Sequence, residues 1–255
     1  MEPRYRRPLN PKQKQILLVL YKFRFGTLEQ LHHYQGIKSV TATTVRLKIL
    51  VEQGYLGRNY DGKYRVQGRP ATYYLRLKAL NWLKTQPQAT PNVIKTIYNN
   101  DKRASKAFIS HSLAIFRLYL DLRSSGFKFF SKSELSAYDY FPKQLPDAYL
   151  SRKEPKDQLI DDIFVSYIAE SMPYFVVRKR FKQMAAYYDG DEWEGEGNQM
   201  PAWLIVCQTE KLEKRLTKNL AKLVDEDSEM NLFITTLDKA GDMGKWQQLF
   251  TAEDD

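Results

Sequence analysis

The pattern of apolar and polar residues between positions 27 and 77 predicts two short helices followed by a two-stranded ribbon. Thr27 and Gln30 have the spacing of a capping box, in which the hydroxyl and amide side chains each satisfy a free backbone N–H. They predict the start of a helix that ends at Gly36. Another helix, beginning at Lys12 with apolar residues at helical spacing, precedes this pair and would complete a three-helix core.

The second helix of the pair is expected to begin at Ser39 or Thr41 and to end at Gly54. Its sequence mixes apolar side chains with short polar and basic ones, which is typical of a helix with one buried side. We expect Val45, Leu47, Ile49 and Leu50 to face the core, and Thr43, Thr44, Arg46 and Lys48 to face outward.

A hairpin is predicted after Gly54. The pair Asp61-Gly62 lies between two apolar runs, residues 55–58 and 72–75. Both residues of such a pair tolerate the positive φ of a tight turn, so the two runs are expected to pair as strands. This order of elements, helices followed by a two-stranded ribbon with a basic tip, is that of a winged helix-turn-helix.

The outward side chains of the second helix are the reason to expect DNA recognition. A helix of this kind lies in the major groove, where short polar side chains and arginine read base edges while nearby cations meet phosphate. A basic helical module that binds protein is the alternative interpretation of the same pattern. The residues expected to contact bases are Thr43, Thr44 and Arg46, and those expected to contact the backbone are Lys48, Arg58, Lys63, Arg65 and Arg69.

The charge distribution favours double-stranded DNA as the partner of the first part of the chain. Residues 1–110 hold 21 Lys and Arg against 5 Asp and Glu, a net charge of +16. Residues 111–255 hold 19 against 25, a net charge of −6. Binding through such cations releases counterions from DNA and weakens steeply with salt, although charge alone gives no sequence preference.

Two domains are expected, a winged helix over residues 1–84 and an α/β domain over residues 103–255. Prolines and short polar residues at 85–102 predict a linker between them. Strands that alternate with helices in the second domain predict a mixed sheet with buried central strands. The expected strands are 127–135, 147–151, 163–169, 203–208 and 231–236, and the expected helices are 103–125, 177–188 and 211–225.

Cysteine content and hydropathy indicate the compartment. Cys207 is the single cysteine and lies in an apolar run, so a framework of internal disulfides is excluded and a reducing cytoplasm is the expected setting. No stretch approaches the apolar length that a membrane span needs. Three histidines and one cysteine are too few for a His/Cys zinc site.

Several short motifs together carry a resemblance to a known family. They are Thr-Leu-Glu-Gln-Leu at 27–31, Val-Arg-Leu-Lys-Ile-Leu-Val-Glu-Gln-Gly-Tyr-Leu at 45–56, Tyr-Tyr-Leu at 73–75, His-Ser-Leu-Ala at 111–114 and Pro-Asp-Ala at 146–148. In these motifs the chain resembles the replication-relaxation family of plasmid and mobile-element proteins. The resemblance implies a winged helix fused to a mixed α/β domain built like the PD-(D/E)xK nucleases, the restriction-endonuclease-like fold.

The same resemblance implies a set of catalytic residues. In such nucleases an early acidic residue, an Asp after Pro and a Glu on the next strand converge on Mg²⁺, which polarises phosphate and activates water. Here these would be Glu134, Asp147 and Glu170, with Asp147 and Glu170 as metal ligands. The usual lysine two positions beyond the Glu is replaced by methionine, so Lys179 or Lys182 would have to substitute from the following helix.

The favoured function is that of a sequence-preferring, double-stranded DNA-binding protein of a plasmid or mobile element, acting in replication, transfer or their transcriptional control. The second domain would then have lost catalysis and would serve homodimerisation or partner contact, without a cofactor. The alternative is a metal-dependent endonuclease or nickase, using Mg²⁺, that the winged helix directs to DNA. A protein-binding adaptor is the third class.

Overall fold

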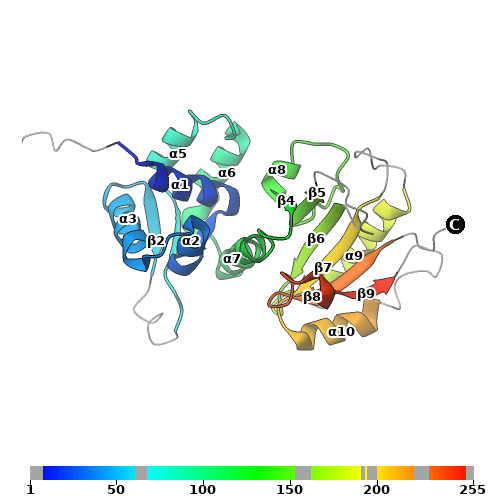
Figure 1. Cartoon of the computed structure of the whole chain (residues 1–255). Helices are drawn as coiled ribbons and strands as arrows, with labels where there is room; N and C mark the ends of the chain where they lie inside the picture. The colour runs from blue at the N-terminus through cyan, green and yellow to red at the C-terminus, as the bar shows by residue number, and fades with distance from the viewer. Residues whose placement is uncertain are drawn as a thin grey trace, which may run out of the picture. The chain divides into compact units, whose positions relative to one another are not determined.

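The protein combines α-helices with two separate β-sheets, one of three strands and one of six (Figure 1). The structure is a computed structural model that describes residues 8–60, 68–152, 162–190, 193, 200–220 and 230–250. The chain divides into two compact units, unit 1 ending at Phe116 and unit 2 beginning at Arg117. In the part described, no helix has both the length and the apolar character that crossing a bilayer requires.

Unit 1 begins with α1 (Pro11–Phe23), β1 (Phe25–Thr27), α2 (Leu28–Gln35), α3 (Val40–Glu52), β2 (Leu56–Asn59) and β3 (Thr72–Leu75). Asn10 starts α1 and Thr27 starts α2, each through a capping box with a glutamine three residues later. The backbone is left-handed at Gly36, which ends α2, and the Ser39 side chain then caps α3. The predicted starts of α2 and α3 and both predicted strands are confirmed.

The three strands of unit 1 form an antiparallel sheet in the order β1-β3-β2. The strand β1 was not predicted, because the sequence indicated only the two strands of the ribbon. Gly57 in β2 lies opposite Tyr74 in β3, and the Tyr74 ring lies only 2.2 Å from the point where a Cβ on residue 57 would be. A larger residue at position 57 would have to displace the Tyr74 ring. The predicted Asp61-Gly62 turn lies outside the described residues.

The segment predicted to be a linker is a structured part of unit 1. It contains α6 (Pro91–Asn100), which follows α5 (Leu77–Leu83), and the short helix η1 (Asp101–Arg103). Pro91 occupies the first turn of α6, where a missing N–H has no cost, so it starts the helix instead of breaking it. The side chains of Ile94 and Ile97, three residues apart, are then buried. The boundary between units falls later, within α7 (Lys106–Asp121).

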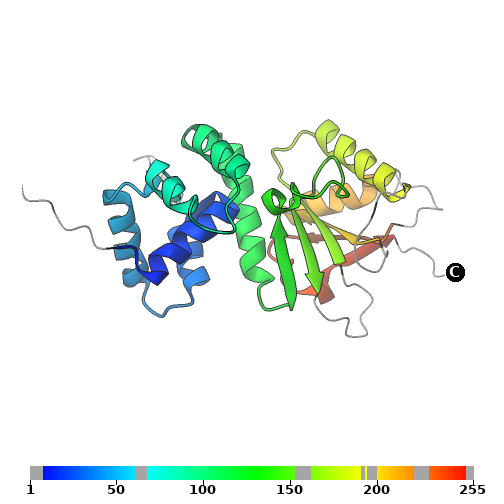
Figure 2. The ribbon, with the colours of Figure 1, turned by 90° about the horizontal axis from the view of Figure 1, so that it is seen from above.

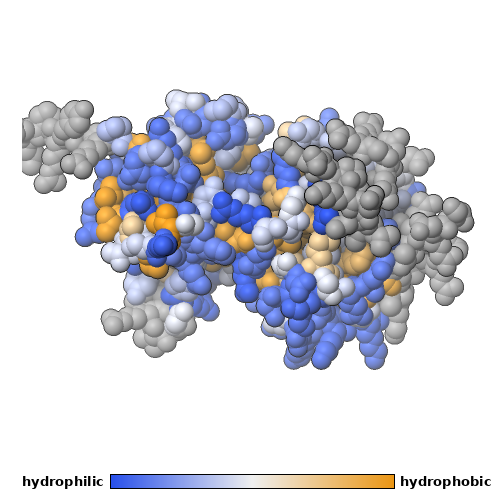
Figure 3. All heavy atoms as spheres, in the orientation of Figure 1, coloured by the Kyte–Doolittle hydropathy of each residue, from blue (hydrophilic) through white to orange (hydrophobic). Residues whose placement is uncertain are grey.

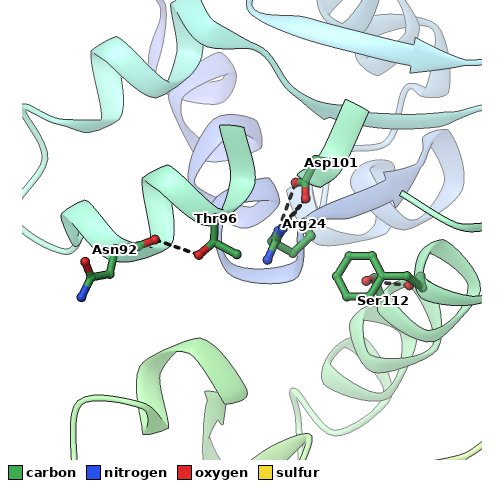
Figure 4. A network of polar contacts seen from close by, with 6 residues as sticks. Arg24, Asn92, Thr96, Asp101 and Ser112 are labelled. Atoms are coloured by element: carbon green, nitrogen blue, oxygen red, sulfur yellow. Dashed lines mark hydrogen bonds and ion pairs between the residues drawn. The ribbon is translucent and has the colours of Figure 1, made fainter. Parts of the chain in front are cut away.

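A buried ion pair joins the end of α1 to η1 (Figure 4). Arg24 has a φ of 72° and directs its guanidinium at Asp101, whose side chain is 1% exposed. Nε of Arg24 donates to both carboxylate oxygens at 3.0 Å, and Nη2 also donates to Oδ1. The Phe108 ring lies 5.4 Å from the guanidinium carbon, so the charge is covered on one side.

Unit 2 contains a mixed sheet whose six strands lie in chain order. The second strand is antiparallel to both of its neighbours, the third, fourth and fifth are parallel, and the last is antiparallel to its neighbour. The mixed sheet was predicted, but its last strand was not. The elements are β4 (Phe127–Ser131), α8 (Lys132–Leu135), β5 (Ala148–Arg152), β6 (Asp162–Ile168), α9 (Tyr174–Tyr188), β7 (Ala202–Cys207), α10 (Glu210–Leu220), β8 (Leu232–Thr236), η2 (Met243–Lys245) and β9 (Gln247–Phe250).

The helices α9 and α10 cover the same face of this sheet, where a core cluster of unit 2 lies (Figure 2). Phe164 of β6 is fully buried at its centre and contacts a group of aromatic rings. On the other face, Tyr119 at the end of α7 makes an edge contact with Phe129, at 5.4 Å between ring centroids. The central strand β7 is buried at every position, so it is covered on both sides, which is typical of strands with near-continuous apolar sequence.

The thiol of Cys207 should be unreactive in the folded protein. It is fully buried in β7, and burial, reinforced by the nearby Glu213 carboxylate, raises its pKa to about 12. Since only the thiolate attacks disulfide reagents, we expect Ellman's reagent at pH 8 to react slowly with the native chain and at once after unfolding in guanidinium chloride. Rapid reaction of one thiol per native chain would contradict this burial.

Candidate nucleic-acid interface

The helix α3 presents one buried and one exposed face. Its buried side chains are Thr43, Leu47 and Leu50, which recur at intervals of four and three residues. The surface over α3 shows apolar patches among hydrophilic ones (Figure 3). Its exposed apolar side chains are Val40, 49% exposed, and Val45, 50% exposed. The exposed face as a whole comprises Val40, Thr41, Thr44, Val45, Lys48 and Glu52.

A buried glutamine holds α3 in place against α2 and α1. The Gln35 side chain, at the end of α2, accepts from Thr43 Oγ1 at 3.3 Å and from an Nη of Arg46 at 3.4 Å. Its amide nitrogen donates to the carbonyl of Lys12 in α1 at 2.9 Å. These bonds satisfy polar groups that would be costly to bury alone, so they fix the angle at which α3 presents its exposed face.

The predicted orientations of Thr43 and Val45 are wrong. Thr43 was expected to face outward, where it would contact bases, but it is fully buried and bound to Gln35. Val45 was expected in the core but is half exposed. The error has a geometric cause, because residues two apart on a helix, such as Val45 and Leu47, lie on different faces. The spacing of Leu47, Leu50 and Thr43 was the signal that could have identified the buried stripe. Thr41 and Val45 are therefore additional candidates for base contact.

The remaining predicted contacts of α3 have different environments. Thr44 is exposed, and its hydroxyl donates to the carbonyl of Val40 one turn earlier at 3.1 Å. Lys48 is also exposed, and its Nζ lies 3.9 Å from a carboxylate oxygen of Glu52 in a weak surface pair. Arg46 is half-buried, and its bond to Gln35 draws it toward α2.

Two of the cations predicted on the ribbon, Arg58 and Arg69, lie among the described residues. Arg58 in β2 is exposed, with its guanidinium carbon 4.6 Å from the centre of the Tyr60 ring. Arg69, just before β3, is exposed as well. Lys63 and Arg65 lie outside the described residues. Arg58 and Arg69 are thus available for contact with a polyanion.

Asp147 lies directly before β5, and its side chain has a hydrogen-bond partner in β6. Its side chain is buried, and Oδ2 accepts from the backbone N–H of Tyr167 in β6 at 2.9 Å. Its own N–H donates to the carbonyl of Val165 at 2.8 Å. The register Ala148↔Val165 places Ser166 opposite Asp147. The residue on the next strand that faces Asp147 is thus a serine, with Ile168 two positions beyond it.

Glu134 and Glu170 each have a hydrogen-bond partner other than Asp147. Glu134 closes the capping box of α8, where Oε2 accepts from the N–H and the hydroxyl of Ser131, both at 2.7 Å. Glu170 lies beyond the end of β6 and accepts from Thr209 Oγ1 at 2.7 Å. Over the described ranges, no three His, Cys, Asp or Glu side chains form a group that could hold a metal ion.

Lys182 lies on the outer face of α9 and is exposed. It lines a shallow hollow with other side chains of the same helix, and none of the three predicted catalytic carboxylates takes part. The lining residues are Phe175, Arg178, Lys179, Lys182, Gln183 and Ala186.

Comparison with known proteins adds one match. A family model described as replication-relaxation matches residues 17–199, which span the α3 face, the ribbon and most of unit 2. Among curated proteins, no match was found.

Proposed function

Because the chain belongs to the replication-relaxation family, we propose that it is a sequence-preferring, double-stranded DNA-binding protein that acts in the replication or transfer of a plasmid or mobile element. In this proposal unit 1 is a winged helix-turn-helix, with α2 and α3 as the two helices of the motif and β2 and β3 as the wing. The order of helices and strands in unit 1 supports this assignment.

The exposed face of α3 is the observation that carries the proposal. A helix of this length, about 20 Å, fits the major groove. Thr44 and Thr41 offer hydroxyl groups to base edges, and Val45 offers an apolar contact for the methyl group of thymine. The Gln35 bonds hold this face in one orientation, so that the same side chains meet the same base positions.

Cations beside α3 would supply the contacts to phosphate. We assign this role to Lys48, Arg58 and Arg69, with Lys63 and Arg65 as further candidates from the sequence. Contacts of this kind fix the position of a protein on the duplex without reading its sequence. They also make the affinity depend on salt, in line with the net charge of +16 over residues 1–110.

We propose that unit 2 has a nuclease-like fold that serves homodimerisation or partner contact and not catalysis. Its order of helix, three antiparallel strands, helix and parallel strand supports the assignment of the fold. The lost catalysis is supported by Ser166 and Ile168, which stand in β6 where a carboxylate and a lysine would be needed beside Asp147. The separate hydrogen bonds of Glu134 and Glu170 support it as well.

The test of this proposal begins with the selection of duplex fragments by the wild-type protein from a random-sequence pool. Binding of variants to the selected duplex is then compared with binding to a scrambled duplex. We expect Thr44→Ala/Val45→Ala to bind the selected duplex about tenfold more weakly and to lose its preference over a scrambled duplex. We expect Arg69→Ala to weaken binding to both duplexes equally and to lower the slope of log affinity against log salt by about 0.9. Fluorescence anisotropy at several salt concentrations measures both effects.

The control for charge is Lys95→Ala, which removes an exposed cation from α6. A random pool that yields no enriched sequence, or an equal loss of preference in the Arg69 and Thr44/Val45 variants, would contradict the assignment of the α3 face. Parallel samples with Mg²⁺ or Mn²⁺ address the enzyme alternative. Metal-dependent strand breakage that Asp147→Ala abolishes would make unit 2 a nuclease.

A further inference from the structure

The outer face of α9 exposes two adjacent aromatic side chains. Phe175 is 73% exposed and Tyr174 is 42% exposed, both in the first turn of the helix. The opposite side of α9 is firmly packed, since Val177 and Phe181 are buried in the core of unit 2. The two rings are therefore exposed on a well-anchored helix, and exposed apolar surface of this kind marks a binding site more often than isolated surface residues do.

Four cations follow these rings along the same helix, and three of them are exposed. Arg178, Lys179 and Lys182 are exposed, and α9 contains no Asp or Glu. As far as the described residues show, none of the three forms an ion pair. Phe175 and Lys179 are four residues apart, as are Arg178 and Lys182, so the ring and the cations occupy neighbouring positions on one surface. With Gln183 and Ala186 they line the shallow hollow, which has a volume of about 520 Å³.

This face suits a linear polyanion with unpaired aromatic bases better than it suits a lipid surface or a protein partner. A helix that binds a lipid surface inserts a broad apolar face, whereas the apolar face of α9 is already buried in the core. The hollow is shallow and formed by one helix, so it offers no deep pocket for the anchor residues of a protein partner. Single-stranded nucleic acid presents unpaired bases for stacking and phosphates for pairing with Lys and Arg.

We propose that the outer face of α9 binds single-stranded DNA. Phe175 and Tyr174 stack on unpaired bases, and Arg178, Lys179 and Lys182 contact the phosphates. Lys182 thus contacts DNA as a phosphate ligand and not as a catalytic group. This site lies in unit 2 and goes beyond the duplex binding proposed for unit 1, because unpaired bases arise wherever replication or transfer opens a duplex.

Binding of the full-length chain to a labelled oligothymidine of about 16 nucleotides provides the test. An abasic strand of the same length serves as the comparison, because it has the phosphates but no bases. We expect the wild-type protein to bind oligothymidine about tenfold more tightly than the abasic strand. Phe175→Ala should weaken oligothymidine binding by about the same factor and leave binding to the abasic strand unchanged, whereas Phe175→Trp should keep both affinities.

The cations are tested through the dependence on salt. Replacing Arg178, Lys179 and Lys182 together by glutamine should lower the slope of log affinity against log salt by about 2. The matched control replaces Lys211, Lys214 and Lys218 by glutamine, which removes the same charge from α10, whose outer side is hydrophilic throughout (Figure 3). This control should leave the slope unchanged.

The outcomes separate this site from that of unit 1 and from other ligands. The variant Thr44→Ala/Val45→Ala should retain oligothymidine binding. Duplex binding by unit 1 and single-strand binding by α9 can therefore fail independently of each other. Equal affinity of the wild type for oligothymidine and the abasic strand would overturn the stacking role. If the α10 control lowered the slope of log affinity against log salt as much as the α9 variant does, the assignment of the site to α9 would be overturned. Binding to phosphatidylserine vesicles that exceeds binding to oligothymidine, and that the α9 variants abolish, would assign the face to lipid.

Discussion

Replacing Arg24 by methionine should destabilise unit 1 by about 3–5 kcal/mol, the cost of leaving a buried charge without its partner. Asp101, which Arg24 neutralises, has a side chain that is 1% exposed. Methionine fills a similar volume, so the loss comes mainly from the charge. The hydrogen bonds from Nε and Nη2 of Arg24 would disappear together, leaving both carboxylate oxygens without these donors (Figure 4).

The double variant Arg24→Met/Asp101→Leu separates the effect of the unpaired Asp101 charge from the effect of lost packing. Because it removes both charges, it should recover most of the lost stability, as apolar replacements of buried ion pairs often do. Hydrogen exchange of the full chain, followed by mass spectrometry on peptides from α1 and α6, reads unit 1 separately from unit 2. The control is Lys48→Met, which breaks an exposed ion pair of the same unit and should cost less than about 1 kcal/mol.

The loss in Arg24→Met should also depend on pH. Burial raises the pKa of the Asp101 carboxyl, and the Arg24 guanidinium opposes this shift. Without Arg24 the pKa in the folded state rises further above that of the unfolded chain. The folded state then binds the proton more tightly, so the variant should come closest to the wild type below the unfolded pKa and lose stability as pH rises through the folded pKa. A deficit that stays constant between pH 4 and pH 8 would show that packing dominates.

Local signals in the sequence predicted the elements of unit 1 well. The capping box at Thr27 and the strand over residues 72–75 depend on neighbours a few residues away, and both are found as predicted. The linker at 85–102 was predicted from composition, which does not tell a helix-starting proline from a helix-breaking one. Pro91 starts α6 because buried positions are available for Ile94 and Ile97, and that depends on the fold of unit 1.

The candidate site was harder to predict because its residues are positioned by distant partners. Thr43 is polar and looked exposed, but Gln35 from another helix satisfies its hydroxyl in the core. The convergence of Glu134, Asp147 and Glu170 depended on strand register and on where β6 ends. Since β6 ends at Ile168, Glu170 falls in the following turn and binds Thr209. Spacing could have placed Thr43 on the buried side of α3, but neither spacing nor composition predicts its bond to Gln35 or the bond between Glu170 and Thr209.

Phe164→Ala should destabilise unit 2 by about 3–5 kcal/mol, as expected when a fully buried phenylalanine is truncated. Phe164 is 0% exposed. The centroid of its ring lies 5.4 Å from that of the Trp193 ring and 6.0 Å from that of the Phe141 ring. Each of these edge contacts would be lost, and the surrounding rings come from several elements that cannot all move into the space. A cavity would remain in the core between the sheet and α9.

The same substitution at Phe175 provides the matched control, because this ring is 73% exposed on the outer face of α9. Phe175→Ala should change the free energy of unfolding by no more than about 0.5 kcal/mol. Urea unfolding followed by tryptophan fluorescence measures both variants, since three of the four tryptophans, Trp193, Trp203 and Trp246, lie in unit 2. A large decrease in the free energy of unfolding of Phe175→Ala would mean that the ring supports the fold. Its presence on α9 would then be explained by stability and not by binding. A small loss, combined with weakened binding of oligothymidine, separates the role of Phe175 in binding from any role in stability.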